Sequence, residues 1–176
     1  MSATYDDGGC EYTYGCMDSG AVNYNSLATI DDKTCIYEFV ATDATFQNFN
    51  DWELVDTNSG ADPFNSGAHG SNDSTVIREV FFFENAAAIN ALYKTGTQIV
   101  KYSHSETSGF FQLTAMAKRG NNFDEAHNNW EWFILKPNGT IAEDSLGQPL
   151  RGKNVLNQYG CASCHYLADT DFVFSK

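Results

Sequence analysis

Residues 76–83 read VIREVFFF, a run of β-branched and aromatic residues flanked by loop sequence rich in Ser, Asn and Asp. Such a run predicts a β-strand. The same composition predicts strands at residues 97–103, 110–118 and 130–135, the last of which ends at the turn sequence Pro-Asn-Gly of residues 137–139. Because the connections are short and of hairpin type, the sequence predicts an antiparallel sheet.

One segment between the strands has the periodicity of a helix. Residues 84–94 hold a run of alanines, with Ile89, Leu92 and Tyr93 at helical spacing, and Thr95-Gly96 follow as a stop. We therefore expect an α+β fold, in which an antiparallel β-sheet is flanked by helices.

Two cations fall on apolar faces of the predicted strands. Successive side chains of a strand point to opposite faces, so Lys101 shares a face with Ile99, and Arg78 shares one with Val80. Cations in such surroundings lie either at a sheet edge or in a pocket.

The composition limits the class of protein. Of the 176 residues, 42% are hydrophobic and 14% aromatic, enough to build a buried core. Ten basic and 23 acidic residues give a net charge of -13, the wrong sign for binding nucleic acid or anionic lipid, whereas an acidic surface suits a basic redox partner protein. No window reaches the roughly 18 consecutive apolar residues of a membrane span.

The start of the chain does not resemble a signal peptide. Met1 is followed by Ser-Ala-Thr-Tyr-Asp-Asp, which has neither a basic n-region nor an apolar h-region. We expect that a signal peptide has been removed from this chain or left out of it.

The first three of the five cysteines lie in a region rich in Gly, Asp, Asn and Tyr. Residues 6–12 match residues 31–37 at both aspartates, the cysteine and the tyrosine, so the start holds one full repeat and the tail of another. The sequence therefore predicts a repeat module at residues 1–38 and a main domain at residues 39–176.

The full repeat resembles short acidic disulfide repeats of secreted and cell-surface bacterial proteins. The resemblance implies a disulfide between Cys16 and Cys35. Cys10 then lacks an upstream partner, so either the native protein is longer at this end or Cys10 pairs between molecules. The side chains of Asp18, Asn23, Asn25, Asp31 and Asp32 offer oxygens of the kind that calcium prefers. Their spacing is not that of a calcium loop, so we expect turns rather than a bound cation, in a module for anchoring, spacing or assembly.

The last two cysteines carry the clearest chemical motif. Cys161-Ala162-Ser163-Cys164-His165 has the spacing by which two thiols, one helical turn apart, bond the vinyl groups of a haem while the histidine binds the iron. The alternatives are a thioredoxin-type redox pair and half of a zinc site. The redox pair usually opens a helix early in its domain, and a zinc site needs a second ligand pair, so the motif favours haem.

A sixth iron ligand would separate electron carriers from gas binders and enzymes. The candidates are Met116, His69, His104 and His127. Met116 falls in a predicted strand, where core packing explains it, and the histidines fall in polar sequence, where we expect them to be solvated. The sequence therefore predicts an iron with one open position.

Several motifs recur in a fixed order from Trp52 to the end of the chain. They are Ile77-Arg78, the predicted helix, GTQIVK at residues 96–101, LTAMAK at residues 113–118, NWEW at residues 129–132, and the haem motif followed by TDFVF at residues 170–174. In this arrangement the domain resembles cytochrome P-460 and its relative, the β-sheet type of cytochrome c′. The resemblance implies a mono-haem homodimer whose iron is five-coordinate through His165.

The resemblance also implies roles for three other residues. A family lysine that bonds to a meso carbon of the porphyrin falls on Lys101, which would otherwise be read as a plain surface lysine. A family arginine near the haem propionates falls on Arg78. The family oxidises hydroxylamine to nitrous oxide, but its distal glutamate falls on Thr114, which cannot accept a proton as a carboxylate can. We therefore expect binding of small nitrogen ligands, with weak or absent hydroxylamine oxidation unless Glu131 or Glu79 supplies a base.

Two other functions stay open. One is a nitric oxide carrier or sensor similar to the β-sheet type of cytochrome c′. The other is an electron-transfer or structural cytochrome that the repeat module tethers to a surface. All three functions imply a periplasmic or cell-surface protein, as the disulfide does.

Overall fold

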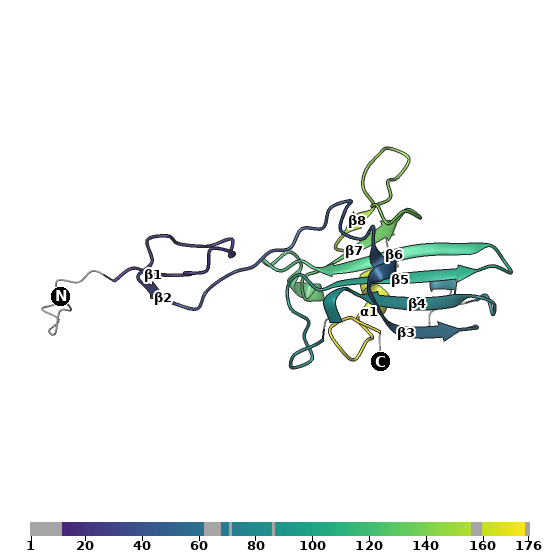
Figure 1. Cartoon of the computed structure of the whole chain (residues 1–176), viewed down its shortest axis with the longest axis horizontal. Helices are drawn as coiled ribbons and strands as arrows, with labels where there is room; N and C mark the ends of the chain where they lie inside the picture. Colours follow the sequence, from purple (N-terminus) through teal and green to yellow (C-terminus); the bar gives the residue numbers. More distant parts are fainter. Residues whose placement is uncertain (1–11, 62–67, 71, 86, 156–159, 175–176) are drawn as a thin grey trace, which may run out of the picture. The chain divides into compact units, whose positions relative to one another are not determined.

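The computed structural model describes residues 12–61, 68–70, 72–85, 87–155 and 160–174. The chain forms two compact units, Met1–Glu38 and Phe39–Lys176 (Figure 1). Within the described ranges no helix has the length and apolar character needed to cross a membrane.

A six-stranded antiparallel sheet forms the larger unit (Figure 1). Its strands are β3 (Glu53–Ser59), β4 (Ile77–Phe82), β5 (Gln98–Ser105), β6 (Phe110–Lys118), β7 (Trp130–Leu135) and β8 (Arg151–Gly152). Each strand pairs with the next one along the chain, as short connections between antiparallel strands favour. The predicted antiparallel sheet is therefore confirmed.

The four predicted strands correspond to β4, β5, β6 and β7. The bounds of β6 and β7 are the predicted ones. The sequence does not predict β3, because this edge strand reads ELVDTNS and is mostly exposed, so it lacks the apolar alternation that marks a half-buried strand. It also does not predict β8, which is only two residues long.

The predicted helix at residues 84–94 is wrong. A 3-10 turn, η4 (Phe83–Asn85), begins this segment, and Ile89 pairs with Leu92 across a tight turn whose two central residues have φ angles of 52° and 63°. Ile89 and Leu92, which belong to the expected apolar face, are 72% and 52% exposed. A short helix is stable mainly when such a face packs on a core, and here the side chains meet none.

Helices are few in the larger unit, which is mostly β-sheet. Within the described ranges the only α-helix is α1 (Cys161–His165). The 3-10 helices that the described residues form besides η4 are η1 (Phe49–Asp51), η3 (Ala68–Gly70) and η5 (Glu125–His127). The sheet of the expected α+β fold is thus present, but its flanking helices are reduced to short turns and α1.

Two apolar clusters cover the two faces of the sheet. The first joins Phe81, Val100, Leu113 and Phe133 to Phe46 and Phe49. The second joins Val80, Ile99, Met116 and Trp132 to Ala162 of α1 and to Val173.

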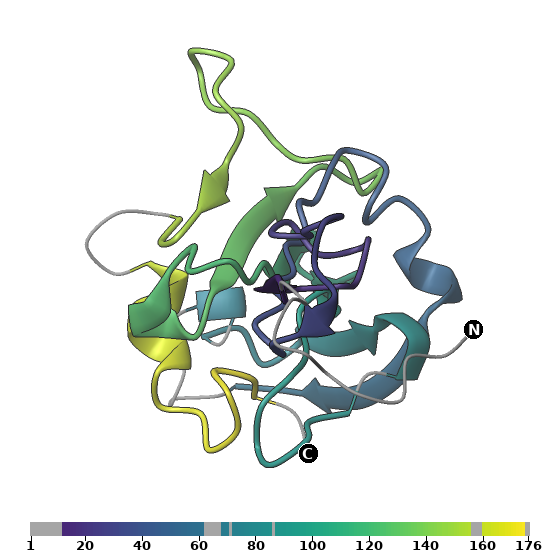
Figure 2. The ribbon, with the colours of Figure 1, turned by 90° about the vertical axis from the view of Figure 1, so that its left-hand side faces the viewer.

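We call the second face the α1 face, and the segment that covers it is yellow in Figures 1 and 2. Val80 and Ile99 lie here while Phe81 and Val100 lie opposite, as alternation along a strand predicts.

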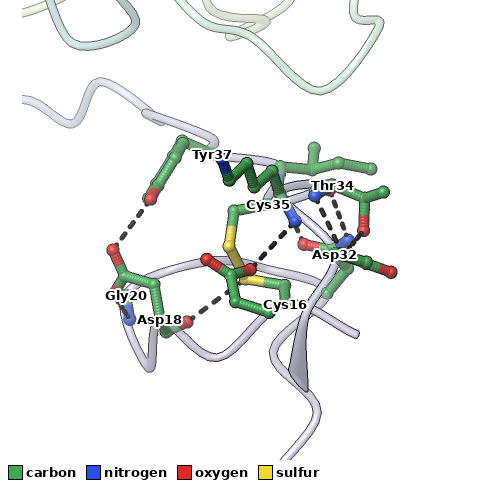
Figure 3. Close-up of a disulfide and its surroundings, with 11 residues drawn as sticks. Cys16, Asp18, Gly20, Asp32, Thr34, Cys35 and Tyr37 are labelled. Carbon is green, nitrogen blue, oxygen red and sulfur yellow. Dashed lines mark hydrogen bonds between the residues drawn. A yellow bond between two sulfur atoms is a disulfide. The ribbon is translucent and has the colours of Figure 1, made fainter. Parts of the chain in front are cut away.

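The smaller unit is held together by the disulfide Cys16–Cys35 (Figure 3). This confirms the disulfide implied by the resemblance to secreted repeats. Two short parallel strands, β1 (Tyr14–Gly15) and β2 (Ile30–Asp31), pair in the same unit. Cys16 is 1% exposed, so the disulfide lies where a larger unit would have an apolar core. Cys10 lies outside the described residues.

The acidic and amide side chains of the smaller unit form turns (Figure 3). Asp18 accepts hydrogen bonds from the Gly20 N–H and the Tyr37 hydroxyl, both at 2.8 Å, and Asp32 accepts from the N–H and hydroxyl of Thr34. The Gly20 N–H lowers the pKa of Asp18, and the Thr34 hydroxyl lowers that of Asp32. Backbone groups also bond to Asn23, Asn25 and Asp31. Asp18, Asn25, Asp31 and Asp32 thus have the turn-forming role of Asx residues, whereas Asn23 bonds to the backbone of Thr34 and Ile36.

Candidate functional site

A cavity opens on the α1 face of the sheet, with about 480 Å³ of empty space that includes its opening to solvent. Its walls are mostly apolar. The side chains with basic, hydroxyl or thiol groups that line it are those of His69, Lys101, Thr114, Cys161 and His165. The structure thus brings together four of the residues that the sequence assigns to one site.

Strand register and helix placement explain this meeting. Lys101 on β5 lies opposite Thr114 on β6, so the middle of the sheet supplies one wall. Cys161 and His165 lie on α1, which packs on the same face. His69 comes from η3, which contacts both β5 and β6.

His165 has one ring nitrogen bonded to the backbone. Its Nδ1 lies 2.7 Å from the carbonyl oxygen of Phe172, which can only accept, so Nδ1 carries the proton and donates. Burial lowers the pKa of His165 to about 4, so the ring is neutral at neutral pH. Nε2 then carries the lone pair, which is the arrangement found in histidines that bind a metal.

A buried aspartate fixes the backbone next to this carbonyl. The Asp171 carboxylate accepts bonds from Lys118 Nζ at 2.6 and 2.8 Å, from the Asn128 amide at 3.0 Å and from the Tyr93 N–H at 2.8 Å. Trp130 Nε1 donates to the Asp171 carbonyl oxygen at 2.7 Å. Two strands, β6 and β7, and two loops therefore hold one residue of the C-terminal segment.

These bonds hold a backbone turn that is unfavourable by itself. Asp171 and Phe172 have φ angles of 45° and 65°, a region that residues other than glycine seldom adopt. Such a conformation persists only where the surroundings determine it. The contacts of Asp171 thus direct the Phe172 carbonyl at the ring of His165.

The two thiols of α1 differ in their surroundings. Cys161 is half-buried and lines the cavity, whereas Cys164 is exposed, and neither forms a disulfide. Burial raises the pKa of Cys161 to about 11. The attacking thiol of a thioredoxin-type pair is exposed and has a lowered pKa, so the first cysteine has the opposite character here.

A zinc site would need more ligands than this pair and His165 supply. Among residues 12–61, 68–70, 72–85, 87–155 and 160–174, no group of three or more His, Cys, Asp or Glu side chains gathers in a way that could hold a metal ion. The described part of the chain therefore offers no second ligand pair for zinc.

Lys101 and Thr114 form the wall opposite α1. Lys101 is half-buried, and its positive charge contributes to the lowered pKa values of His69 and His165, after the larger effect of burial. The Thr114 hydroxyl donates to the backbone carbonyl of Lys101 at 3.5 Å. A lysine nitrogen and a hydroxyl are thus placed at one apolar cavity.

Arg78 does not line the cavity. It is 1% exposed, and it donates from Nε to the carbonyl of His69 at 2.9 Å, from Nη1 to that of Gly60 at 2.9 Å and from Nη2 to that of Gly70 at 3.0 Å. The resemblance to cytochrome P-460 predicts Arg78 beside a propionate of the haem. In the structure its guanidinium donates to these three backbone carbonyls, and it holds η3 against the sheet.

His69 is a candidate iron ligand from the sequence, but its surroundings are predicted wrongly. The sequence predicts a solvated loop histidine, but the ring lines the cavity, and its Nδ1 lies 3.2 Å from Oε1 of Gln112. Burial lowers its pKa to about 3, so the ring is neutral. A histidine in polar sequence has no periodicity that would reveal such a position.

The other candidates for a sixth ligand lie in different surroundings. Met116 is 5% exposed and lines the cavity. His104 belongs to β5 rather than to a loop, and its Nε2 lies 3.2 Å from Glu79. His127 Nδ1 lies 2.7 Å from Asp124. Neither of these two histidines lines the cavity.

The two carboxylates considered as a distal base are engaged elsewhere. Glu79 pairs with His104. Glu131 is 2% exposed and accepts from Arg151 Nε at 2.7 Å and Nη2 at 2.9 Å. Neither lines the cavity, so neither offers a base there.

The donor set fits an iron porphyrin attached through thioethers. Cys161 and Cys164 lie one turn apart on α1, and the neutral ring of His165 offers Nε2 as a ligand. Trp132 also lines the cavity, and its buried Nε1 has no hydrogen-bond partner among the described residues. A polar group of a bound molecule would satisfy this donor.

Comparisons with models of protein families, with curated proteins and with solved structures find no match to this chain.

Proposed function

We propose that this chain is a mono-haem c-type cytochrome, with haem bonded to Cys161 and Cys164 and its iron bound by Nε2 of His165. The observation that carries the proposal is the hydrogen bond between His165 Nδ1 and the Phe172 carbonyl, at an apolar cavity that Cys161 also lines. This bond orients the ring and leaves Nε2 for the metal.

A bound haem supplies the redox chemistry and a binding place for small ligands. The chain supplies the surroundings. Val80, Ile99 and Met116 give the cavity apolar walls, and Thr114 offers a hydroxyl to a bound ligand. The ligands that we propose are small nitrogen compounds such as hydroxylamine and nitric oxide.

Lys101 is proposed to bond through Nζ to a meso carbon of the porphyrin. This bond replaces one N–H and one C–H bond, so two electrons and two protons leave. A peroxide can take them up, because hydrogen peroxide is reduced to two molecules of water in the same step. Lys101 lies at the cavity that Cys161 and His165 also line, and this placement supports the cross-link.

Oxidation of hydroxylamine is proposed to be weak or absent. Removing protons from this substrate needs a base, and Thr114 offers only a hydroxyl, which already donates to the Lys101 carbonyl. Glu79 and Glu131, which could otherwise serve, are paired away from the cavity.

The protein is proposed to work in the periplasm or at the cell surface. Disulfides such as Cys16–Cys35 form and persist in oxidising compartments. The net charge of -13 suits a basic redox partner and gives no basis for binding nucleic acid. We also propose that two copies associate, as the resemblance implies.

The test is the mass of the peptides from protein produced with the cellular machinery that attaches haem c. The peptide with Cys161 and Cys164 should be heavier by one haem, and the Lys101 peptide should stay joined to it. Lys101→Arg keeps a positive side chain but should not form the cross-link. The peptide with residue 101 should then be released, while the haem stays on the peptide with Cys161 and Cys164. Lys136→Arg, at an exposed lysine, is the matched control and should change nothing. A colourless protein, or a pigment that acidified organic solvent extracts, would contradict the proposal.

A further inference from the structure

We infer that His69 is a second axial ligand of the proposed haem, bound on the side of the iron away from His165. The inference rests on the proposed function. It differs from the open position that the sequence predicts, and it assigns a role to a histidine of η3 that no motif marks.

The distance between the two rings is the first argument. The ring centres of His69 and His165 lie 6.5 Å apart. Two imidazoles that bind one metal ion from opposite sides, each at about 2 Å, have ring centres roughly 6 Å apart. A histidine that only hydrogen-bonds a ligand on the iron must leave room for that ligand, so its ring would be more distant. The observed distance therefore favours direct binding.

The relative orientation of the rings agrees with this. The ring planes of His69 and His165 are inclined by 83°. Each ligand plane contains its own metal–nitrogen axis, and rotation about that axis leaves the bond intact. Two ligands on one axis can therefore have planes at any angle, and here the planes are nearly perpendicular.

The hydrogen bonds of both histidines leave the same atom for the metal. Oε1 of Gln112 can only accept, so His69 Nδ1 donates to it at 3.2 Å and Nε2 carries the lone pair. His165 donates from Nδ1 to the Phe172 carbonyl in the same manner. Both rings thus donate from Nδ1 to an oxygen acceptor, which is the hydrogen bond that typically orients a metal-binding histidine.

The backbone of His69 is held in a conformation that is unfavourable by itself. It adopts φ 52° and ψ 35°, and the following Gly70 has φ 67°. Arg78, 1% exposed, donates to the carbonyls of both residues. A left-handed histidine stabilised by a buried arginine is the kind of strain that accumulates at functional sites. Arg78 is therefore a positioning residue for His69.

Met116 is the competing ligand, because it also lines the cavity. It packs in the apolar cluster of the α1 face with Ile99 and Trp132, and it is 5% exposed. Packing accounts for Met116, whereas it does not account for a strained, half-buried histidine beside His165.

A second ligand would change how the site works. Hydroxylamine or nitric oxide would have to displace His69 before binding, so that ligand entry is controlled by the η3 turn. Without displacement, the protein would transfer electrons only.

The experiment compares the haem-loaded protein with His69→Gly. Glycine adopts positive φ without strain, so the η3 turn should persist. The parent protein should have a low-spin ferric spectrum, with the single large g value typical of nearly perpendicular imidazole planes. His69→Gly should lose this signal, become high-spin and regain a low-spin spectrum when imidazole is added. Met116→Leu, which conserves volume, and His104→Gln, outside the cavity, should keep the parent spectrum.

Three results would overturn the inference. A high-spin parent protein with covalent haem would contradict the second ligand but leave the proposed function in place. Loss of the low-spin signal in Met116→Leu, with no change in His69→Gly, would assign the position to Met116. A colourless parent protein would overturn both the inference and the proposed function.

Discussion

Thr114 determines, at the scale of a single residue, whether the site has a base. It is 8% exposed, lines the cavity and lies opposite Lys101 in the sheet, so a side chain at this position faces the proposed ligand site. We expect Thr114→Glu to raise hydroxylamine turnover, by up to roughly 100-fold, the lower end for a general base. The assay is hydroxylamine oxidation by the haem-loaded protein with an artificial electron acceptor.

Thr114→Gln is the matched control for this prediction, because it has the size of glutamate without the charge. It should leave turnover at the parent level. No gain in Thr114→Glu, with the haem retained, would mean that this wall of the cavity is not where the substrate binds.

Asp171 is expected to be the most sensitive ionic residue of the domain. Its pair with Lys118 is buried, with side-chain exposures of 0% and 9%. Asp171→Asn leaves the lysine charge without its partner, so the free energy of unfolding should fall by about 3 kcal/mol, the lower end for breaking a buried pair. Urea unfolding of the haem-free and haem-loaded protein measures the change.

An exposed ion pair supplies the comparison for Asp171. Glu143 and Lys136 lie 3.4 Å apart with exposures of 54% and 44%, so Glu143→Gln should cost less than about 1 kcal/mol. Equal losses in the two variants would show that the Asp171 contacts do not stabilise the domain.

The residues that sequence reasoning found are those with local signals. Cys161 and His165 lie in one short motif, and Lys101 follows from alternation along a strand together with a family resemblance. His69 and Asp171 have no local signal. Their partners, Gln112 and Lys118, lie 43 and 53 residues away in the chain, so only the folded structure brings them together.

At the scale of an element, Gly160 allows α1 to start where it does. Its φ of -69° suits any residue, but a Cβ there would lie 2.5 Å from the Val155 carbonyl oxygen and closer still to Oδ1 of Asn154. Gly160→Ala should therefore displace the start of α1, at a cost of about 1–3 kcal/mol, and should lower the yield of attached haem. The ratio of haem absorbance to protein mass measures this yield.

Ser163→Ala is the control on the same helix. Ser163 is exposed, so the substitution should change neither the stability nor the haem yield. If Gly160→Ala also left the stability and the haem yield unchanged, the close contact at the start of α1 would not limit which residue can stand at position 160.

Strands could be predicted from the sequence where one of their faces is buried. The strands β6 and β7 alternate or are buried along their length, and their bounds agree with the prediction. The segment at residues 84–94 has helical spacing, but of its expected apolar face only Tyr93 packs on the core, while Ile89 and Leu92 are exposed. Periodicity reports which side chains could share a face, whereas the rest of the fold decides whether that face is buried.

At the scale of the whole molecule, the two units depend on different forces. Neither apolar cluster of the larger unit includes a residue before Phe39, and the smaller unit relies on the Cys16–Cys35 disulfide. The double variant Cys16→Ser, Cys35→Ser should destabilise the smaller unit by about 3 kcal/mol. Hydrogen exchange followed by mass spectrometry should show faster exchange there and unchanged exchange in β4–β7. Faster exchange throughout would mean that the larger unit needs the disulfide.

The site as a whole could be predicted only in part. The disulfide, the antiparallel sheet and the meeting of Lys101, Thr114, Cys161 and His165 at one cavity agree with sequence reasoning. The position of Arg78 and the entry of His69 do not follow from it, because both depend on the path of a loop. Loop paths are set by non-local hydrogen bonds, for which composition is a poor guide.

The neighbour-to-neighbour order of the strands has a consequence for biogenesis. Each strand pairs with the one before it, so the sheet can form progressively from β3 to β8, and in the chain α1 follows the strands that it covers. Attachment of a prosthetic group at Cys161 and Cys164 would thus be a late event on a largely formed scaffold. A maturation enzyme would then meet the two thiols of α1 on a surface that β3–β8 have already formed.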